Sequence, residues 1–357
     1  MRFVLIFAVC LLAAWGCGGK LATQVVTRSK MLYVAKRDDA RIHCFDIEID
    51  PDNLPEGEEE SDKWPMYRVG TAAPILAFAI SPNMRWLFAI NDLGRVEMFE
   101  SKFSGRLNRF AAPIIPAGNA TKASIVTPDS SAVYFATDAG KVFGFGIDSS
   151  GVTTPATPGG IAGASNPSFA IVRPDGKALY IADKSANKIW QYEILPAGGL
   201  QPLTPASVDV AGGPDGMFWD SQSTKLYVSC TASNQVAQFS TVVGGQITEA
   251  NRVAGPGGPG VPVMDRNENF LFVPSNDGSG DIWRYQATGS LVALNPPRHT
   301  NHEDQIETRL SGQDVFVLND TDDSFSTYVV FNDGTLGLQE TVDLLTHPVA
   351  TAYRRLP

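Results

Sequence analysis

The chain has few charged residues, few histidines and few cysteines. Of its 357 residues, 18% are charged, 4 are His and 4 are Cys. Acidic residues outnumber basic ones by 38 to 28, and the net charge of -10 disfavours binding to nucleic acid or to an anionic lipid surface. An apolar content of 43% excludes a disordered chain, and the lack of repeated long apolar runs excludes a multi-span membrane protein. A soluble globular chain with a large core is expected.

Common chemical motifs are missing as well. The sequence has no P-loop, no His-Glu-x-x-His zinc pair, no nucleophile elbow and no Cys-x-x-Cys. Residues 255–260 match the dinucleotide-binding pattern as a string, but two prolines interrupt it and a strand is expected to follow. We therefore predict an ordinary connection there and no organic cofactor. Cys44 and Cys230 lie in strand-like segments, where two buried thiols are favoured and a disulfide stays an alternative.

The N-terminus has the features of an export signal. Arg2 precedes an apolar run that ends at Trp15, and about 15 residues are too few for a membrane-spanning helix, which needs about 20. Residues 14–17 resemble a bacterial lipobox, which implies acylation of Cys17. The sequence thus predicts a signal peptide at 1–16, a short tether at 17–24, and a lipoprotein of the outer membrane or periplasm, held in the membrane by the lipid alone. Plain secretion is the alternative.

One short unit recurs along the rest of the chain. An apolar segment centred on Tyr or Phe appears seven times, with the central residues 55, 46, 46, 47, 45 and 44 positions apart. A second aromatic follows each of them after 11 to 13 residues. The pairs are Tyr33 and Phe45, Phe88 and Phe99, Tyr134 and Phe145, Tyr180 and Tyr192, Tyr227 and Phe239, Phe272 and Tyr285, and Phe316 and Tyr328. Turn-forming residues lie between the members, so each pair predicts a β-hairpin.

The units also share a preceding apolar segment that ends in a turn, such as Pro-Asn at 82–83 or Pro-Asp at 128–129. The first unit has no clear copy of it, and residues 347–353 of the tail supply one, with residues 24–29 as the competing segment. We therefore predict an all-β fold over residues 25–357. It is a seven-bladed β-propeller with four antiparallel strands per blade, closed by the C-terminal strand pairing into blade one.

Two segments carry a family resemblance. Residues 174–183 and 224–229 closely resemble YVTN-type repeats, which occur in lactonase-like seven-bladed propellers, a group that includes 6-phosphogluconolactonase and carboxymuconate-cyclising enzymes. The resemblance implies the propeller fold for nearly the whole mature chain. It implies less about activity, because the repeat is associated with packing of the blades.

The catalytic stretch of lactonase-type members is altered here. Those members often carry Gly-Pro-Arg-His entering a central blade and Asn-Glu after the tyrosine strand. This chain has Gly-Pro-Asp-Gly at 213–216, with Asp215 in place of Arg, and Ser-Cys at 229–230. A partial likeness occurs at residues 297–299, which read Pro-Arg-His. These departures argue against a typical lactonase.

The remaining candidates for chemistry cluster near the last blade. The connection into it carries Arg298, His299, His302, Glu303 and Asp304, and the connection into the tail strand carries His347. Such connections meet at one rim of a propeller, so His299, His302, Asp304 and His347 are the predicted catalytic residues. Arg298, Glu303 and Asp215 are predicted to bind substrate, and imidazoles with carboxylates can also hold a divalent cation. The alternative is that all are solvated loop residues.

Two functions follow from these observations. The main hypothesis is a monomeric binding or scaffold module that presents its loop rim to a protein or a glycan, since the repeat is intact while the central catalytic stretch is missing. The alternative is a lactonase-like hydrolase with its site at the channel mouth.

Overall fold

The computed structural model describes residues 30–36, 39–46, 67–102, 106–299, 305–311, 314–319, 324–343 and 348–355. The predicted signal peptide, the tether, Cys17 and the competing segment 24–29 lie outside these residues. The described part is almost entirely β-strand, with two short 3-10 turns, η2 (Pro196–Gly198) and η3 (Val243–Gly245). No helix in it is long or apolar enough to cross a membrane.

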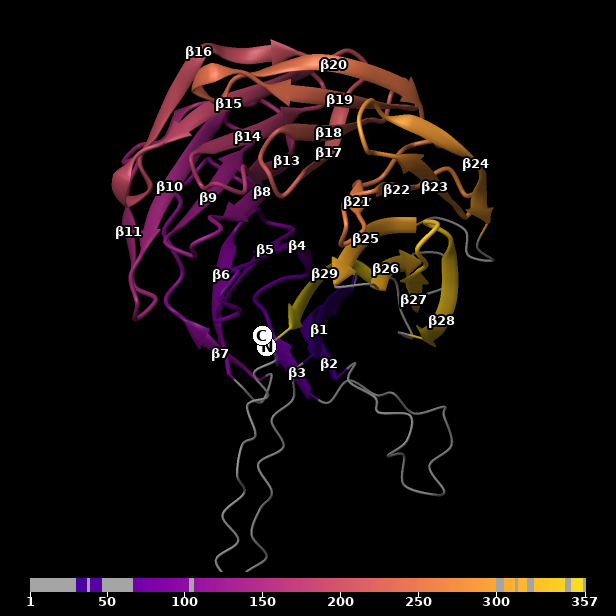
Figure 1. Ribbon diagram of the computed structural model, residues 1–357. Helices are drawn as coiled ribbons and strands as arrows, with labels where there is room; N and C mark the ends of the chain where they lie inside the picture. The colour runs from indigo at the N-terminus through magenta and orange to yellow at the C-terminus, as the bar shows by residue number, and fades with distance from the viewer. Residues whose placement is uncertain are drawn as a thin grey trace, which may run out of the picture.

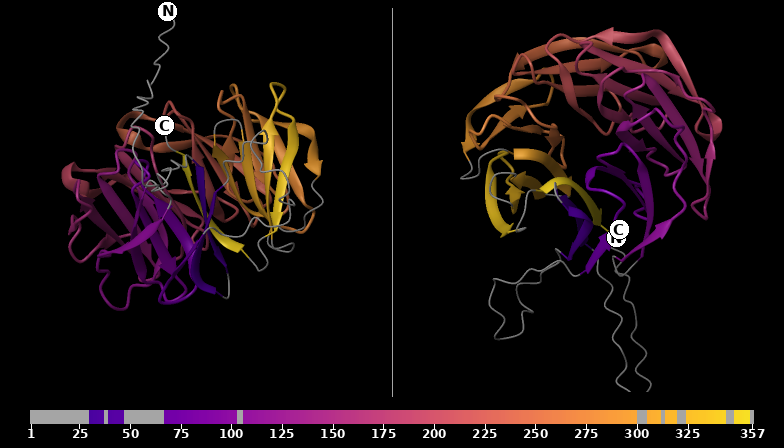
Figure 2. Two further views of the ribbon diagram at one scale, coloured as in Figure 1. Left: turned by 90° about the horizontal axis from the view of Figure 1, so that it is seen from below. Right: turned by 180° about the vertical axis from the view of Figure 1, so that it is seen from behind.

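The strands of the described residues form seven antiparallel sheets, which follow one another around a common centre (Figure 1). The first strand along each sheet lies nearest the centre, and the last lies farthest out. Figure 2 shows the same sheets from the side and from behind, with their strands running between two rims. The first two sheets contain β29 (Pro348–Arg355), β1 (Lys30–Lys36), β2 (Asp39–Asp46) and β3 (Tyr67–Gly70), and then β4 (Ile75–Ile80), β5 (Trp86–Asn91), β6 (Val96–Ser101) and β7 (Leu107–Phe110).

The third sheet departs from the expected four strands. It contains β8 (Thr121–Val126), β9 (Ala132–Thr137), β10 (Lys141–Ile147), β11 (Thr153–Pro155) and β12 (Ile161–Ala162), and both β11 and β12 pair with β10. The prediction of four strands per blade is therefore wrong for this sheet. The reason is local: Pro155 has no N–H for the ladder, and Gly159 and Gly160 adopt positive φ angles of 80° and 72°, which interrupts one outer strand and makes two short ones.

The other four sheets have four strands each. They contain β13 (Pro167–Val172), β14 (Ala178–Asp183), β15 (Lys188–Ile194) and β16 (Leu200–Asp209); β17 (Pro214–Trp219), β18 (Lys225–Cys230), β19 (Gln235–Thr241) and β20 (Ile247–Ala254); β21 (Val263–Met264), β22 (Phe270–Pro274), β23 (Asp281–Gln286) and β24 (Val292–His299); and β25 (Gln305–Ser311), β26 (Asp314–Asn319), β27 (Ser324–Val330) and β28 (Leu336–Asp343). The tail strand β29 pairs with β1, so Tyr353 lies opposite Leu32.

The aromatic pairs lie on the second and third strands of each sheet. Across these hairpins, the second aromatic is paired with the residue that precedes the first one, as Phe99 is with Leu87 and Tyr192 is with Leu179. Successive side chains of a strand point to opposite faces. The two aromatics of a sheet therefore point to opposite neighbours.

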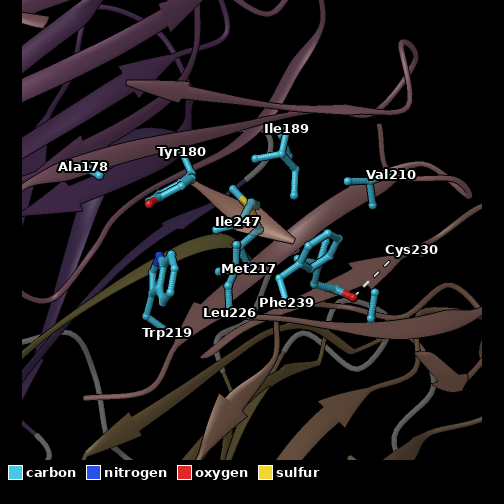
Figure 3. Packing of buried hydrophobic residues seen from close by; sticks show 13 residues of the cluster. Ala178, Tyr180, Ile189, Val210, Met217, Trp219, Leu226, Cys230, Phe239 and Ile247 are labelled. Carbon is cyan, nitrogen blue, oxygen red and sulfur yellow. Dashed lines mark hydrogen bonds between the residues drawn. The ribbon is translucent and has the colours of Figure 1, made fainter. Parts of the chain in front are cut away.

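This alternation builds the core between sheets. In six buried clusters, the first aromatic of one sheet meets the second aromatic of the next: Tyr33 with Phe99, Phe88 with Phe145, Tyr134 with Tyr192, Tyr180 with Phe239, Tyr227 with Tyr285, and Phe272 with Tyr328. Figure 3 shows the cluster of Tyr180 and Phe239, in which the ring centroid of Trp219 lies 5.1 Å from that of Tyr180. Burial of each such ring contributes about 1.5–3 kcal/mol.

Buried polar atoms in these clusters mostly have partners. The Tyr180 hydroxyl donates to the carbonyl of Gly245 in the next sheet, and the hydroxyls of Tyr33 and Ser101 are 2.7 Å apart. Cys44 and Cys230 are buried thiols on different sheets, so the alternative of a disulfide is wrong. Burial raises the pKa of the Cys230 thiol, which keeps it protonated and unreactive.

The turns between first and second strands connect neighbouring sheets. Met84, Ser130, Ser223 and Glu268 have positive φ angles between 57° and 63° although none is glycine. Three of these side chains accept a hydrogen bond from a backbone N–H in the corresponding turn of the preceding sheet: Ser130 from Asn83, Ser223 from Asp175, and Glu268 from Ser221. Glycine would relieve the backbone strain and remove these bonds. The turns therefore stabilise the packing of one sheet on the next.

Candidate functional site

The rim at which the chain enters each sheet, here called the entry rim, carries the candidate site. The hairpins between second and third strands reach the same rim, because the N–H of Thr121 at the start of β8 donates to Gly94 in the hairpin of the preceding sheet. The N–H of Asp138, in the next hairpin, donates to the carbonyl of Ala120. These hydrogen bonds place the starts of the inner strands beside the hairpin loops.

A bulge recurs at the start of the inner strands. Pairing skips from Ile75 to Ala77 in β4, and equivalent skips occur in β8, β13, β17 and β25. A bulge at the rim of a sheet changes the direction of side chains that would point into the core if the strand pairing were regular. The residues at these bulges have no partner on the second strand. Those whose side chains are described are Leu76, Lys122, Ser168 and Asp215, and Gly216 lies in the same bulge as Asp215. We call Leu76, Lys122, Ser168 and Asp215 the mouth.

Asp215 of the mouth lies beside an opposite charge on the neighbouring sheet. Nζ of Lys184, in the hairpin after β14, lies 2.8 Å from Oδ2 of Asp215, and the side chains are 44% and 31% exposed. At such exposure an ion pair contributes about 0–1 kcal/mol, so its main effect is to orient both groups. Lys122 is exposed, and the Ser168 hydroxyl donates to the carbonyl of Pro214 at 3.1 Å. The arrangement can bind an oxygen-rich molecule by contacts of both signs.

The acidic residues of the hairpin loops accept hydrogen bonds that stabilise the turns. Asp183 is 1% exposed and accepts the backbone N–H groups of Ser165 and Ala186 at 2.8 and 3.1 Å. Asp277 accepts hydrogen bonds from Ser275 and Ser279, which lower the pKa of its carboxyl. Among the described residues, no three His, Cys, Asp or Glu side chains are grouped to hold a metal ion. The described carboxylates do not fit a metal centre.

The predicted catalytic residues are only partly within the described chain. Arg298 and His299 are the last two residues of β24, opposite Ile282 and Asp281 of β23. The connection that we expected at Arg298 therefore starts later, because the strand continues through His299. His302, Glu303, Asp304 and His347 lie outside the described residues. Of the predicted site, the structure places the side chain of Asp215 alone, at the mouth, and the grouping of the histidines stays a prediction.

A cavity on the entry rim was not predicted from the sequence. It has a volume of about 640 Å³ and lies between the hairpin after β5 and the connection from β7 to β8. Both walls are loops without hydrophobic periodicity, so no sequence pattern indicates that they enclose a cavity. The available signal was the Pro-Ile-Ile-Pro stretch at 113–116, in which Ile114 is 85% exposed.

Comparisons with known proteins bear on the fold. Residues 167–277 match the family model of the SMP-30/gluconolactonase/LRE-like region. The periplasmic gluconolactonase of Pseudomonas aeruginosa superposes with a TM-score of 0.73 at 18% identity, over 92% of this chain and 99% of that one. This chain has the lactonase-like β-propeller fold. The resemblance expected from the YVTN-type repeats is thereby confirmed.

Other solved propellers agree. A Bacteroides fragilis protein, assigned provisionally as a 6-phosphogluconolactonase, has a TM-score of 0.74 at 15% identity, over 94% of this chain and 99% of that one. A Lactobacillus plantarum protein has a TM-score of 0.74 at 16% identity, over 91% of this chain and 99% of that one. No curated protein matches the sequence. At these identities the likeness of the propellers shows the fold, and the activity has to be argued from the site.

Proposed function

We propose that this propeller hydrolyses lactones at the mouth on its entry rim. The observation that carries the proposal is the position of the family match: residues 167–277 include Ser168 and Asp215 of the mouth, together with Lys184, the ion-pair partner of Asp215. The gluconolactonase of Pseudomonas aeruginosa, which has the same fold, supports this activity over the scaffold hypothesis.

The chemistry requires few groups. Water attacks the lactone carbonyl while a general base takes its proton; the acyl C–O bond then breaks, and the ring oxygen leaves as an alcohol after accepting a proton. Lys122 and Lys184 can stabilise the oxyanion, and Asp215 can accept a hydrogen bond from a substrate hydroxyl. His299, His302 or His347 is the proposed base, with Asp304 as its orienting partner, while Arg298 and Glu303 bind the substrate. No step is assigned to a metal ion.

Ring closure is part of the same proposal, because a mouth needs a complete ring of inner strands. We propose that the seven sheets are seven blades and that β29 completes the first of them. Pairing of β29 with β1 supports this, as do the contacts that β29 makes with β4 on one side and with β25 on the other. Deletion of residues 348–357 is expected to expose the edge of β1 and to cause self-association, measured by light scattering. A truncated chain that stays monomeric and fully stable would contradict closure.

We also propose export with acylation of Cys17, which rests on the N-terminal sequence alone. Mass spectrometry of the mature N-terminus tests it: the expected mass includes a diacylglycerol on the cysteine, and Cys17→Ser should release the protein from the membrane fraction. An unmodified mature N-terminus after residue 16 would leave plain secretion.

Hydrolysis is tested with a panel of sugar γ- and δ-lactones, with and without a phosphate group, each in the presence and absence of divalent metal. We expect turnover, and we expect Lys122→Ala, which removes one charge-stabilising donor, to lower kcat/KM by about a hundredfold to a thousandfold. Asp215→Asn, which weakens one charged hydrogen bond to the substrate, should lower kcat/KM by about tenfold to a hundredfold. Lys177→Ala, at an exposed lysine on the opposite rim, is the matched control and should keep full activity. His299→Ala, His302→Ala and His347→Ala identify the base.

Failure of the whole panel, with and without metal, would overturn the proposal. The protein or glycan binding module would then be the better hypothesis. Turnover that survives all three histidine variants would keep hydrolysis but reject the proposed base.

A further inference from the structure

The cavity on the entry rim, here called the rim cavity, is separate from the mouth. It is bounded by the hairpin after β5, the connection into β8 and one residue of the hairpin after β9. Its lining residues are Leu93, Gly94, Arg95, Val96, residues 113–120 and Asp138. The volume of about 640 Å³ falls within the range of about 300–1,000 Å³ that is usual for sites of small organic ligands.

The walls of the rim cavity are held in place by hydrogen bonds. The N–H of Ala120 donates to Oδ1 of Asp138 at 3.0 Å, and Nδ2 of Asn119 donates to the carbonyl of Pro116 at 3.1 Å. Gly94 has a φ of 69°, and a Cβ there would lie 2.4 Å from Cβ of Ala120. The hairpin and the connection therefore approach each other as closely as a glycine permits, which gives a preformed site.

The lining combines apolar side chains with one cation. Leu93 and Ile114 are 57% and 85% exposed, which is high for large apolar residues on two facing loops. Arg95 is exposed, and its guanidinium makes no ion pair within 4.0 Å with any carboxylate of the described residues. Asp138 carries the opposite charge, but its carboxylate accepts a hydrogen bond from the N–H of Ala120 and thereby stabilises the conformation of the connection into β8.

We propose that the rim cavity binds a small organic anion with an apolar body, such as an aliphatic carboxylate. The guanidinium of Arg95 would receive the anionic group through paired hydrogen bonds, which suit the planar geometry of a carboxylate. The hydrocarbon part would cover Leu93 and Ile114, whose exposure to water it removes. This site goes beyond lactone hydrolysis, because it uses none of the residues assigned to the mouth.

Isothermal titration calorimetry of the full chain with hexanoate tests the proposal. We expect saturable binding of hexanoate, with hexanol and hexylamine at least tenfold weaker, since both lack the negative charge. Arg95→Gln should weaken hexanoate binding at least tenfold, and Ile114→Ser about threefold to tenfold. Arg266→Gln removes an exposed arginine from a turn on the opposite rim and should bind hexanoate like the unaltered protein.

Three results would overturn the proposal: no heat of binding at millimolar hexanoate, equal affinity for hexylamine, or unchanged affinity in Arg95→Gln with its circular dichroism spectrum intact. Arg95→Lys, which keeps the charge and loses the paired geometry, should bind with intermediate affinity. The readout is binding and not turnover, so it is independent of whether the propeller hydrolyses lactones.

Discussion

Equivalent tyrosines on adjacent sheets should respond in opposite directions to loss of their hydroxyl groups. Tyr134 and Tyr180 occupy the same position of the repeat, and they are 1% and 0% exposed. The hydroxyl of Tyr180 donates to the carbonyl of Gly245, whereas the buried hydroxyl of Tyr134 has no hydrogen-bond partner among the described residues. Burial raises the pKa of both tyrosines, for Tyr180 to about 12.

The size of each effect follows from these contacts. Tyr180→Phe loses a net hydrogen bond and is expected to lower the free energy of unfolding by about 1 kcal/mol. Tyr134→Phe removes a buried hydroxyl that has lost its hydrogen bonds to water without making one in the protein. It should therefore raise the free energy of unfolding by about 1–3 kcal/mol. The two variants should therefore differ by at least about 2 kcal/mol. At about 2.1 cal/mol/K per residue, that corresponds to roughly 3 °C in Tm.

The assay is urea denaturation followed by tryptophan fluorescence, with scanning calorimetry for Tm. Tyr227→Phe is the graded control, because its hydroxyl lies 3.5 Å from the carbonyl oxygen of Ala287, at the limit of a hydrogen bond. Its effect should lie between those of the other two variants. If Tyr134→Phe destabilises the protein as much as Tyr180→Phe does, the reasoning from unpaired hydroxyls is refuted.

Three further predictions concern stability. Because burial raises the pKa of Tyr180 to about 12, its contribution to stability should be constant up to about pH 10 and fall between about pH 10 and 12, where only the unfolded state ionises; a stability difference between the unaltered protein and Tyr180→Phe that stays constant up to about pH 12 would contradict this. Gly151→Ala should lower the free energy of unfolding by more than about 2 kcal/mol, because the φ of Gly151 is 90° and a Cβ would lie 2.2 Å from the ring of Trp86. Gly244 has a φ of 85° with open space around it, so Gly244→Ala should lower the free energy of unfolding only by the backbone strain of about 1 kcal/mol. A urea titration measures both changes. Glu97→Gln removes the charge from a carboxylate that is 8% exposed, accepts the N–H of Ala72 at 2.8 Å and pairs with Arg109, so thermal scans should show a loss of about 1.5–3 kcal/mol, as for a hydrogen bond to a charged group.

The hairpins could be predicted from the sequence because aromatic spacing and turn residues are local signals. Phe99 and Tyr192 lie on third strands as expected, and their pairing with Leu87 and Leu179 follows from the turn lengths. The partners between sheets could not be read from the spacing alone, since they depend on which face each strand presents to which neighbour. Pro155 was visible in the sequence, but its effect on the third sheet depends on a ladder that only the fold supplies.

The candidate site was harder to predict, for a physical reason. The bulges that expose Lys122 and Asp215 arise where a connection joins an inner strand, and no residue pattern marks them. Sequence reasoning instead selected rare residue types, and of those only Asp215 has a described side chain. Loop chemistry is set by neighbours that are distant in sequence, as Lys184 and Asp215 illustrate.

The pairing of β29 with β1 also has a consequence for biosynthesis. The ribosome makes β1 among the first strands and β29 last, so the first sheet waits for its inner member until translation ends. A nascent chain therefore lacks the inner strand of its first sheet until the residues of β29 have left the ribosome, so the first sheet cannot be complete before then.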